Sequence, residues 1–317
     1  MGSLKLFIAD LLVKTFSNLM PPKLMKDKRY FQVWERKGYH ITPNHFYEHV
    51  PNISTLREDL WNKHSELPGI EMNESKQLAL LSEFADKFKN EYDQLPLDET
   101  LIKQPYEYYI KNTSFTEVDG EIFYCIIRHF KPRRIFEIGA GFSTYLAAHA
   151  LMKNNETDGI EAELVSFEPY PNEVLKKGFP GFSRLVAKGV ERIGVSDFTE
   201  LVENDVLFID SSHVLKIGSD VQYEYLEILP RLNKGVIIHA HDIFLPAEYL
   251  KDWVLKDYRF WTEQYLLQSF LSFNDSFEVL WAGSYMHLRH SEKLVAAFRS
   301  YNRIKSWPAS FWIRKTK

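Results

Sequence analysis

The sequence predicts an α/β protein whose mostly parallel sheet is covered by helices. Two observations support this prediction. From Arg134 onwards, short apolar runs alternate with segments of helical spacing, which is typical of parallel strands joined through helices. A turn with two glycines, Gly139-Ala140-Gly141, follows the first run and precedes a helical stretch. We therefore expect one principal α/β domain, preceded by further helical residues.

Five of the apolar runs are predicted to be parallel strands. They cover residues 134–139, 163–168, 183–187, 205–210 and 235–242. Two later runs, 277–282 and 284–288, are separated by Gly283 alone and are expected to form an antiparallel hairpin at the edge of the sheet.

The sequence as a whole suggests four regions. Residues 1–29 contain apolar residues spaced by three and four before the proline pair 21–22, which predicts an amphipathic helix and its end. Residues 30–120 are rich in aromatics and predict a helical cap region, with one helix near 74–92. Residues 121–290 form the predicted α/β domain, and residues 291–317 a basic, aromatic tail.

Composition and charge restrict the class of protein. The chain has 317 residues, a net charge of −4 and a single cysteine, Cys125, so no disulfide can form within it and a cytoplasmic location is expected. The two ends are basic, and the residues between them are strongly acidic. An acidic body lacks the basic face that nucleic-acid binding requires, so no nucleic-acid partner is expected.

The two basic ends raise the question of a surface partner. The amino-terminal helix is expected either to dock on its own domain, to dock on a second copy in a homodimer, or to lie on a membrane surface. The tail carries aromatic residues among basic ones, a mixture that suits an anionic lipid headgroup layer. These aromatic residues are Phe298, Trp307, Phe311 and Trp312.

The glycine turn is a candidate ligand loop. Glycines allow a tight turn and close approach of a ligand, and the free N–H groups of a new helix favour a negatively charged group. Glu137 ends the strand before the turn, where its carboxylate is expected to face the same crevice as the turn. Its charge would repel a dinucleotide pyrophosphate but suit a ligand with a cationic amino acid end. Thr144 occupies the position of the third glycine in a dinucleotide-binding pattern, which also disfavours that class of ligand.

A second acidic residue, Glu168, ends the next predicted strand. At that position a carboxylate can accept hydrogen bonds from both hydroxyl groups of a ribose. The segment Lys188-Gly189-Val190-Glu191 follows the third strand and is a candidate for the loop beside an adenine ring.

The segments EIGAGFS, SFEP, DVLFIDSSH and GVIIHAHD together resemble class I S-adenosylmethionine-dependent methyltransferases of the small-molecule branch, methyltransferase family 24. The resemblance covers roughly residues 38–290. It implies a Rossmann-like, seven-stranded sheet with an antiparallel last strand, and S-adenosylmethionine as cofactor. The cofactor-binding candidates are Glu137, Gly139, Gly141, Ser143, Thr144, Glu168, Val190 and Asp210.

The resemblance also implies a divalent metal site. In catechol-type methyltransferases an aspartate after the fourth strand and an acidic–amide pair after the fifth hold a cation that orients a substrate hydroxyl. Asp210, His241 and Asp242 match these positions, but His241 replaces the first member of the pair. Imidazole favours manganese, iron, cobalt, nickel or zinc over magnesium, so both the identity of the metal and its presence stay open.

Methyl transfer without a metal is the alternative. Positioning plus one general base can suffice, and an imidazole can act as that base at neutral pH. His213 is the first candidate for the base because it follows Asp210 closely, and His241 is the second. Glu263, at the start of a helix between the fifth and sixth strands, is a candidate for the acceptor site.

The sequence therefore predicts methyl transfer, expected at oxygen, to a small-molecule or sugar-like acceptor. Two other functions stay open. A nicotinamide-dependent oxidoreductase uses a similar sheet, and a non-catalytic relative would bind a metal or a partner through Asp210, His241 and Asp242.

Overall fold

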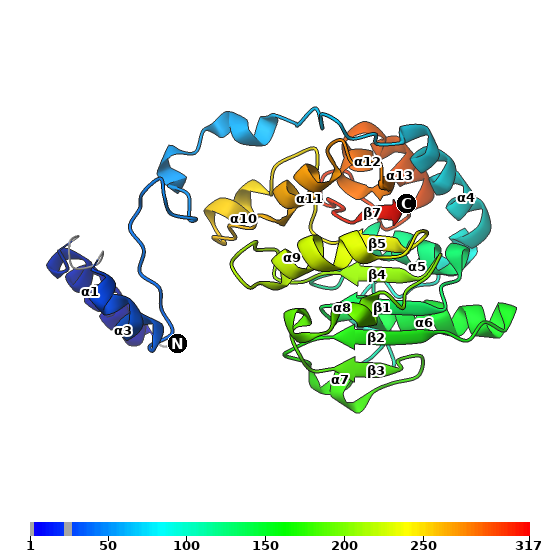
Figure 1. Ribbon diagram of the computed structural model, residues 1–317, viewed down its shortest axis with the longest axis horizontal. Helices are drawn as coiled ribbons and strands as arrows, with labels where there is room; N and C mark the ends of the chain where they lie inside the picture. Colours follow the sequence, from blue (N-terminus) through cyan, green and yellow to red (C-terminus); the bar gives the residue numbers. More distant parts are fainter. Residues whose placement is uncertain (1–2, 22–26) are drawn as a thin grey trace. The chain divides into compact units, whose positions relative to one another are not determined.

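The structure is a computed structural model that describes residues 3–21 and 27–317 (Figure 1). The chain divides into two compact units, Met1–Glu58 and Asp59–Lys317. This division lies far from the boundaries expected at residues 29, 120 and 290, because the cap helix and the carboxyl-terminal residues pack on the sheet of the larger unit.

The larger unit is built around a seven-stranded sheet in the order β3-β2-β1-β4-β5-β7-β6. The strands are β1 (Arg134–Ile138), β2 (Glu163–Phe167), β3 (Arg184–Val186), β4 (Val206–Ile209), β5 (Ile237–Ala240), β6 (Phe277–Ala282) and β7 (Phe311–Lys315). Strands β1 to β5 pair in parallel, and β7 pairs antiparallel with both β5 and β6. The predicted fold class and its five parallel strands are confirmed.

Alternate strand residues face two separate apolar layers. One layer includes Ile135 and Phe208 and packs against α4 (Glu74–Tyr92), α5 (Asp119–Phe130), α6 (Phe142–Asp158) and α13 (Ser291–Ala297). The other includes Phe136 and Leu207 and packs against α8 (Val195–Phe198), α9 (Asp220–Tyr223), η6 (Glu224–Ile228) and α11 (Glu263–Leu271). Every residue of β4 and β5 is buried, as expected for parallel strands covered on both faces.

The connections place the carboxyl ends of β1 and β4 at a point where the strand order reverses. From β1 the chain moves outward through β2 and β3, and it then returns to the other side of β1 with β4. Ligands of open α/β sheets bind at such a point, because the loops on either side diverge and leave a crevice.

Two expectations about the end of the sheet are wrong. Residues 284–288 do not form a strand but belong to helix α12 (Gly283–Arg289), because five residues are too few for an apolar pattern to distinguish strand from helix. The antiparallel partner of β6 is instead β7, from the segment expected to be a tail. Phe311 and Trp312 are buried there, between β5 and β6, and Phe298 is buried against Tyr92.

The remaining elements of the larger unit are short. They are η3 (Glu58–Asn62), η4 (Glu99–Leu101), α7 (Glu173–Lys177), η5 (Val190–Arg192), η7 (Leu229–Arg231) and α10 (Lys251–Leu255). The helix expected near 74–92 is confirmed as α4, but residues 93–118 contain only η4. The expectation of a helical region throughout 30–120 is therefore wrong for much of its length.

The smaller unit contains α1 (Ser3–Leu19), η1 (Lys28–Tyr30), α3 (Phe31–Glu35) and η2 (Ile53–Thr55). The predicted amino-terminal helix is confirmed as α1. Its Phe16 ring meets the Trp34 ring of α3 edge to face, with centroids 5.9 Å apart. The proline pair expected to end this helix falls partly outside the described residues, which include Pro21 but not Pro22. No helix among the described residues is long and apolar enough to cross a membrane.

Candidate active site

The glycine turn brings the ends of β1 and β4 together. Gly139 has a φ of +81°, a conformation that costs glycine little, and a Cβ there would collide with the backbone carbonyl of Asp210. The Gly139 N–H donates to the Phe167 carbonyl (3.0 Å), and the Asp210 N–H donates to the Ile138 carbonyl (2.8 Å). A Cβ on Gly141 would meet no atom within 4 Å, so the turn is crowded on one side only.

Glu137 supports this turn from inside the protein. Its side chain is 1% exposed and accepts hydrogen bonds from the hydroxyls of Ser143 (2.7 Å), Thr144 (2.7 Å) and Ser166 (2.5 Å). Burial raises its pKa to about 7, although the three hydroxyl donors act in the opposite direction. Glu137 therefore holds the start of α6 against β1 and β2.

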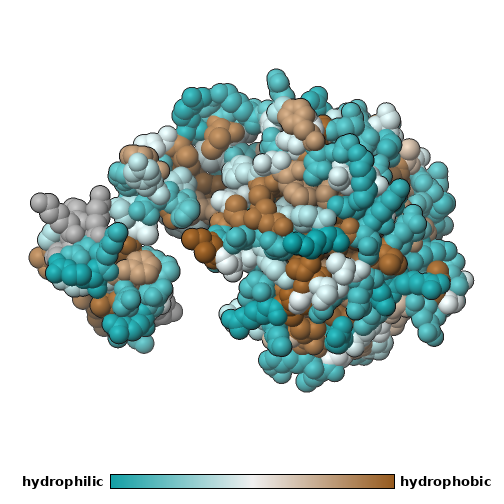
Figure 2. All heavy atoms as spheres, viewed as in Figure 1, coloured by the Kyte–Doolittle hydropathy of each residue, from teal (hydrophilic) through white to brown (hydrophobic). Residues whose placement is uncertain are grey.

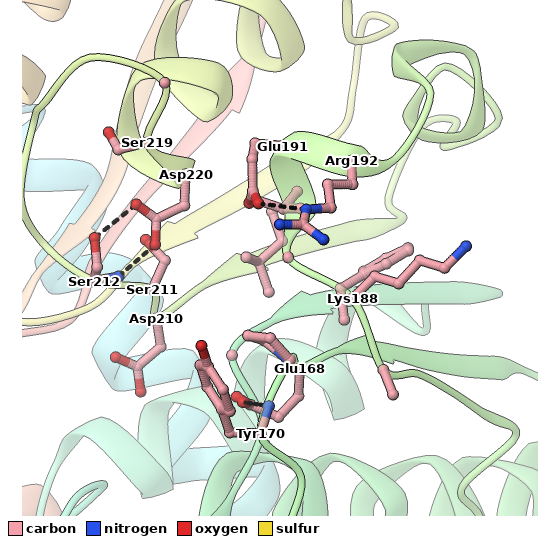
Figure 3. A pocket seen from close by; sticks show the side chains of 18 of the residues that line it. Glu168, Tyr170, Lys188, Glu191, Arg192, Asp210, Ser211, Ser212, Ser219 and Asp220 are labelled. Atoms are coloured by element: carbon pink, nitrogen blue, oxygen red, sulfur yellow. Dashed lines mark hydrogen bonds and ion pairs between the residues drawn. The ribbon is translucent and has the colours of Figure 1, made fainter. Parts of the chain in front are cut away.

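The pocket beside the turn measures about 670 Å³ and lies at the carboxyl ends of β1, β2 and β4 (Figure 3). Of the predicted cofactor residues, those that line it are Gly139, Glu168, Val190 and Asp210. The others, Glu137, Gly141, Ser143 and Thr144, are not among its lining residues. The expectation that the Glu137 carboxylate faces the crevice is wrong, because this side chain shares the buried strand face of Ile135.

Glu168 is held in the pocket by its neighbours. One carboxylate oxygen accepts from the Tyr170 N–H (2.7 Å) and the other from the Ala140 N–H (3.3 Å). Each oxygen keeps further acceptor capacity, so the carboxylate can receive donors from a ligand. The 188–191 segment forms another wall, where Val190 is buried while Lys188 and Glu191 are exposed.

A second group of polar residues lies beside Asp210, centred on the His213 imidazole. Its Nε2 lies 3.3 Å from Asp210 Oδ1 and 3.5 Å from Asp242 Oδ2, and its Nδ1 lies 2.8 Å from Glu263 Oε2. His213 and Asp242 have φ values of +59° and +54°, which are strained for residues with a side chain. The structure thus brings three carboxylates around one imidazole, from the loops after β4 and β5 and from the start of a later helix.

The charges in this group are strongly coupled. Burial acts to lower the pKa of His213, but its hydrogen bonds to Asp210 and Glu263 outweigh burial and raise that pKa well above 6.5. Burial is opposed at Asp210 by the charges of His241 and His213, which lower its pKa, whereas burial raises the pKa of Asp242. The surrounding carboxylates therefore favour the imidazolium form of His213, which donates to them.

Asp210, His213 and Asp242 are the set of described residues that could hold a metal ion here. One ligand atom from each lies within 4.8 Å of the others. His241, the histidine expected in this set, is not part of it. Its Nε2 lies 3.7 Å from Asp242 Oδ1 but 3.3 Å from the Ser114 carbonyl, with which it forms a hydrogen bond. Two carboxylates and one imidazole form a donor set that suits manganese, iron or zinc better than magnesium.

Glu263 lies behind the imidazole. It is fully buried at the start of α11, and its second oxygen accepts from the Tyr225 hydroxyl (2.9 Å). The N–H groups of Thr262 and Glu263 both donate to the His213 carbonyl, and the Trp261 ring lies against the imidazole at 4.4 Å. Glu263 is therefore placed to fix the orientation of His213.

Several polar residues of the site were not predicted. Asp220 accepts from both the N–H and the hydroxyl of Ser212, which shapes the pocket wall after β4 (Figure 3). Ser211 donates to Glu224, whose pKa burial raises well above its ordinary value. The only signal in the sequence is the spacing of four between these two acids, which also occurs on many solvated helices.

His239, by contrast, is a core residue. It stacks on Phe208 with ring centroids 3.9 Å apart, and its Nε2 forms a hydrogen bond with the Ser310 hydroxyl (2.9 Å). Burial lowers its pKa well below 6.5. It points to the same strand face as His241, as the alternation of side chains along a strand predicts.

Comparison with known proteins identifies similar sequences. A family model described as a methyltransferase domain, methyltransferase family 24, matches residues 136–243. This range includes the glycine turn, Glu168, Asp210 and Asp242. An uncharacterized protein of Archaeoglobus fulgidus is 33% identical over 177 residues, which cover 53% of this chain and 76% of that protein.

Two solved structures show weaker likeness. A TDP-rhamnose 3'-O-methyltransferase of calicheamicin biosynthesis aligns over 77% of this chain and 95% of its own, with 13% identity and a TM-score of 0.40. A putative protein-L-isoaspartate O-methyltransferase of Plasmodium falciparum, in complex with S-adenosyl-L-homocysteine, aligns over 52% and 83%, with 13% identity and a TM-score of 0.30.

Proposed function

Because the chain belongs to the S-adenosylmethionine-dependent methyltransferases, we propose that it methylates a hydroxyl oxygen of a small, sugar-like acceptor. The observation that carries this proposal is that one residue, Asp210, belongs both to the pocket and to the group of polar residues around His213. Asp210 lines the pocket that contains Glu168 and also contacts His213. A methyl donor bound in the pocket and an acceptor bound at His213 would therefore meet at Asp210.

The pocket fits the cofactor. Glu168 offers a carboxylate for the ribose hydroxyls, Val190 an apolar surface for the adenine ring, and Gly139 a backbone without a side chain at the closest approach. When bound, S-adenosylmethionine supplies a methyl group on a positively charged sulfur. Glu137, Ser143 and Thr144 act from behind the turn and keep its backbone in place.

The group around His213 orients the acceptor. In the displacement, the acceptor oxygen forms a bond to the methyl carbon while the carbon–sulfur bond breaks and its electron pair stays on sulfur. The hydroxyl proton passes to Asp242 Oδ1, the carboxylate oxygen that does not face His213. Asp210, His213 and Asp242 would hold a divalent cation, which would lower the pKa of the acceptor hydroxyl. Glu263 keeps the His213 Nδ1 proton and thereby directs Nε2 toward the two aspartates.

The raised pKa of His213 changes its proposed role. The three surrounding carboxylates favour the imidazolium form of His213, which has no free lone pair to take a proton from the acceptor, so we do not assign His213 as the general base. We assign it instead to the cation-binding group, where a metal ion and a proton compete for Nε2. His241 forms a hydrogen bond to Ser114 and is assigned no direct part in proton transfer.

Calorimetric titration of S-adenosylhomocysteine tests the cofactor site. We expect Glu168→Ala to bind about tenfold to a hundredfold more weakly than the wild type, because charged hydrogen bonds to the ligand are lost. Glu173→Ala, an exposed acid on α7 outside the pocket, is the matched control and should bind normally. Equal affinity of all three proteins would contradict the proposed site.

The acceptor is tested separately, by incubation with S-adenosylmethionine carrying an isotope-labelled methyl group and a panel of sugar-like alcohols and amines. Label in an alkali-stable ether supports oxygen as the acceptor atom. Transfer to amines alone would overturn that part of the proposal.

A further inference from the structure

The described residues of the smaller unit leave their apolar side chains exposed. No described residue between 3 and 58 with an assigned exposure is buried, whereas its large apolar side chains are mostly open to solvent. Those on α1 are Leu4, Leu6, Phe7, Ile8, Leu11, Leu12, Val13, Phe16 and Leu19. In Figure 2, brown apolar side chains lie at the surface of this unit among teal ones. Such a helix requires a covering partner, because contiguous apolar patches are rarely left in water.

The apolar residues of α1 occupy most of the circumference of the helix. At 100° per residue, Asp10, Lys14 and Ser17 gather on one narrow side, and Ile8, Leu12 and Leu19 lie opposite them. Lys14 and Asp10 form an ion pair at 2.7 Å on the polar side. Lys5 interrupts the apolar side only in the first turn, where a long side chain can direct its amine past the helix end.

The charge of this region complements an anionic surface. Residues 1–29 carry six basic and two acidic side chains, in a protein whose net charge is −4. Phe46 and Tyr47, 81% and 82% exposed, add aromatic side chains of the kind found at membrane interfaces. Basic charge near an apolar helix strengthens its binding to anionic lipid.

We propose that the smaller unit binds the surface of an anionic lipid membrane, with α1 lying in the headgroup layer. A second copy of the chain fits α1 less well than a membrane does. A contact between two helices buries only a narrow face of each helix, so it would leave Leu6 and Val13 of α1 exposed to water. A lipid surface accepts a wide apolar side and the positive charge together. This inference does not depend on the methyl-transfer site.

The structure also restricts the membrane-binding surface expected at the carboxyl-terminal end. Phe298, Phe311 and Trp312 belong to the core of the larger unit and cannot contact lipid without unfolding it. Trp307, which is 38% exposed, donates a hydrogen bond to Ser284 (2.9 Å). The proposal is therefore confined to the smaller unit.

Sedimentation of the full chain with vesicles tests the proposal. We compare phosphatidylcholine vesicles with vesicles containing about one third phosphatidylglycerol, and expect binding to the second kind only. Ile8→Gln/Leu12→Gln should weaken binding about tenfold or more, through the loss of buried apolar area. Ser17→Gln, on the polar side, is the matched control and should bind as the wild type does. Lys5→Gln/Lys14→Gln should weaken binding roughly fivefold per lysine.

Each of three results would overturn the proposal. The first is that the wild type stays in the supernatant with both kinds of vesicle. The second is that the Ile8→Gln/Leu12→Gln protein binds as strongly as the wild type. The third is that light scattering shows a dimer that this substitution dissociates, while no vesicle binding occurs. The last result would assign α1 to a second copy. Calorimetric binding of S-adenosylhomocysteine by every variant provides the check that the larger unit remains folded.

Discussion

The two units use apolar residues in opposite ways. In Asp59–Lys317, apolar side chains from strands and helices meet in two continuous layers, and Trp281 and Trp312 are completely buried. In the described part of Met1–Glu58, α1 holds nine large apolar residues and all are exposed. Hydrophobic content alone therefore does not indicate a core. What matters is whether the fold brings a second apolar face to the first.

The largest effect is expected in the sheet. Trp312 of β7 contacts the rings of Phe123 and His239, so Trp312→Ala should lower the free energy of unfolding by about 3–5 kcal/mol, through lost burial and the cavity left behind. Urea unfolding followed by circular dichroism measures this change. Val295→Ala, at an exposed position of α13, should change it by less than about 1 kcal/mol. Similar losses in both variants would mean that β7 is not part of the core.

The buried acid under the glycine turn should give the core a pH dependence. Glu137 keeps its proton in the folded protein up to a pH of about 7, whereas the unfolded chain releases it near 4.5. Between these values the folded state binds more protons, so the free energy of unfolding falls as pH rises, by up to about 3 kcal/mol. Glu137→Gln should flatten this fall in unfolding experiments at a series of pH values. An unchanged slope would show that Glu137 is ionised in the core.

Manganese binding should separate the two histidines of the site. His213→Gln should weaken binding about tenfold or more, because it removes a ligand atom, and His241→Gln should leave it within about twofold. Electron paramagnetic resonance of free manganese provides the measurement. Weaker binding in His241→Gln alone would restore the set expected from the sequence, Asp210, His241 and Asp242.

The smallest effect is expected in α1. Leu12 is 64% exposed, so Leu12→Ala should change the free energy of unfolding in the absence of lipid by no more than about 0.5 kcal/mol. The same urea experiment applies. A loss comparable to that of Trp312→Ala would mean that α1 is packed in solution and that the contrast between the units is false.

Much of the sheet could be predicted, since its parallel strands are short apolar runs ending in polar residues at one edge. The strand face on which the Glu137 side chain lies could also have been predicted, because side chains alternate along a strand and Glu137 therefore shares the face of Ile135 rather than that of Phe136. Strand β7 was missed because its five residues end in Arg314 and Lys315, which read as part of a basic tail.

The replacement of His241 by His213 could not be predicted in the same way. Both histidines follow strand ends, and the choice between them depends on loop conformations. His213 reaches Asp242 because both residues adopt positive φ values, which no spacing in the sequence encodes. Glu263 illustrates the same point, since it meets His213 from 50 residues further along the chain.

The position of β7 has a consequence for biosynthesis. Strand β7 lies between β5 and β6, so until residues 311–315 have left the ribosome β5 is paired on one side only, with β4, and β6 has no strand partner. During translation β5 therefore presents an open parallel edge and β6 has no partner, and such edges invite pairing with other nascent chains. The sheet can close only after about 70 further residues have followed β5. We therefore expect the larger unit to depend on protection by chaperones until synthesis has passed β7.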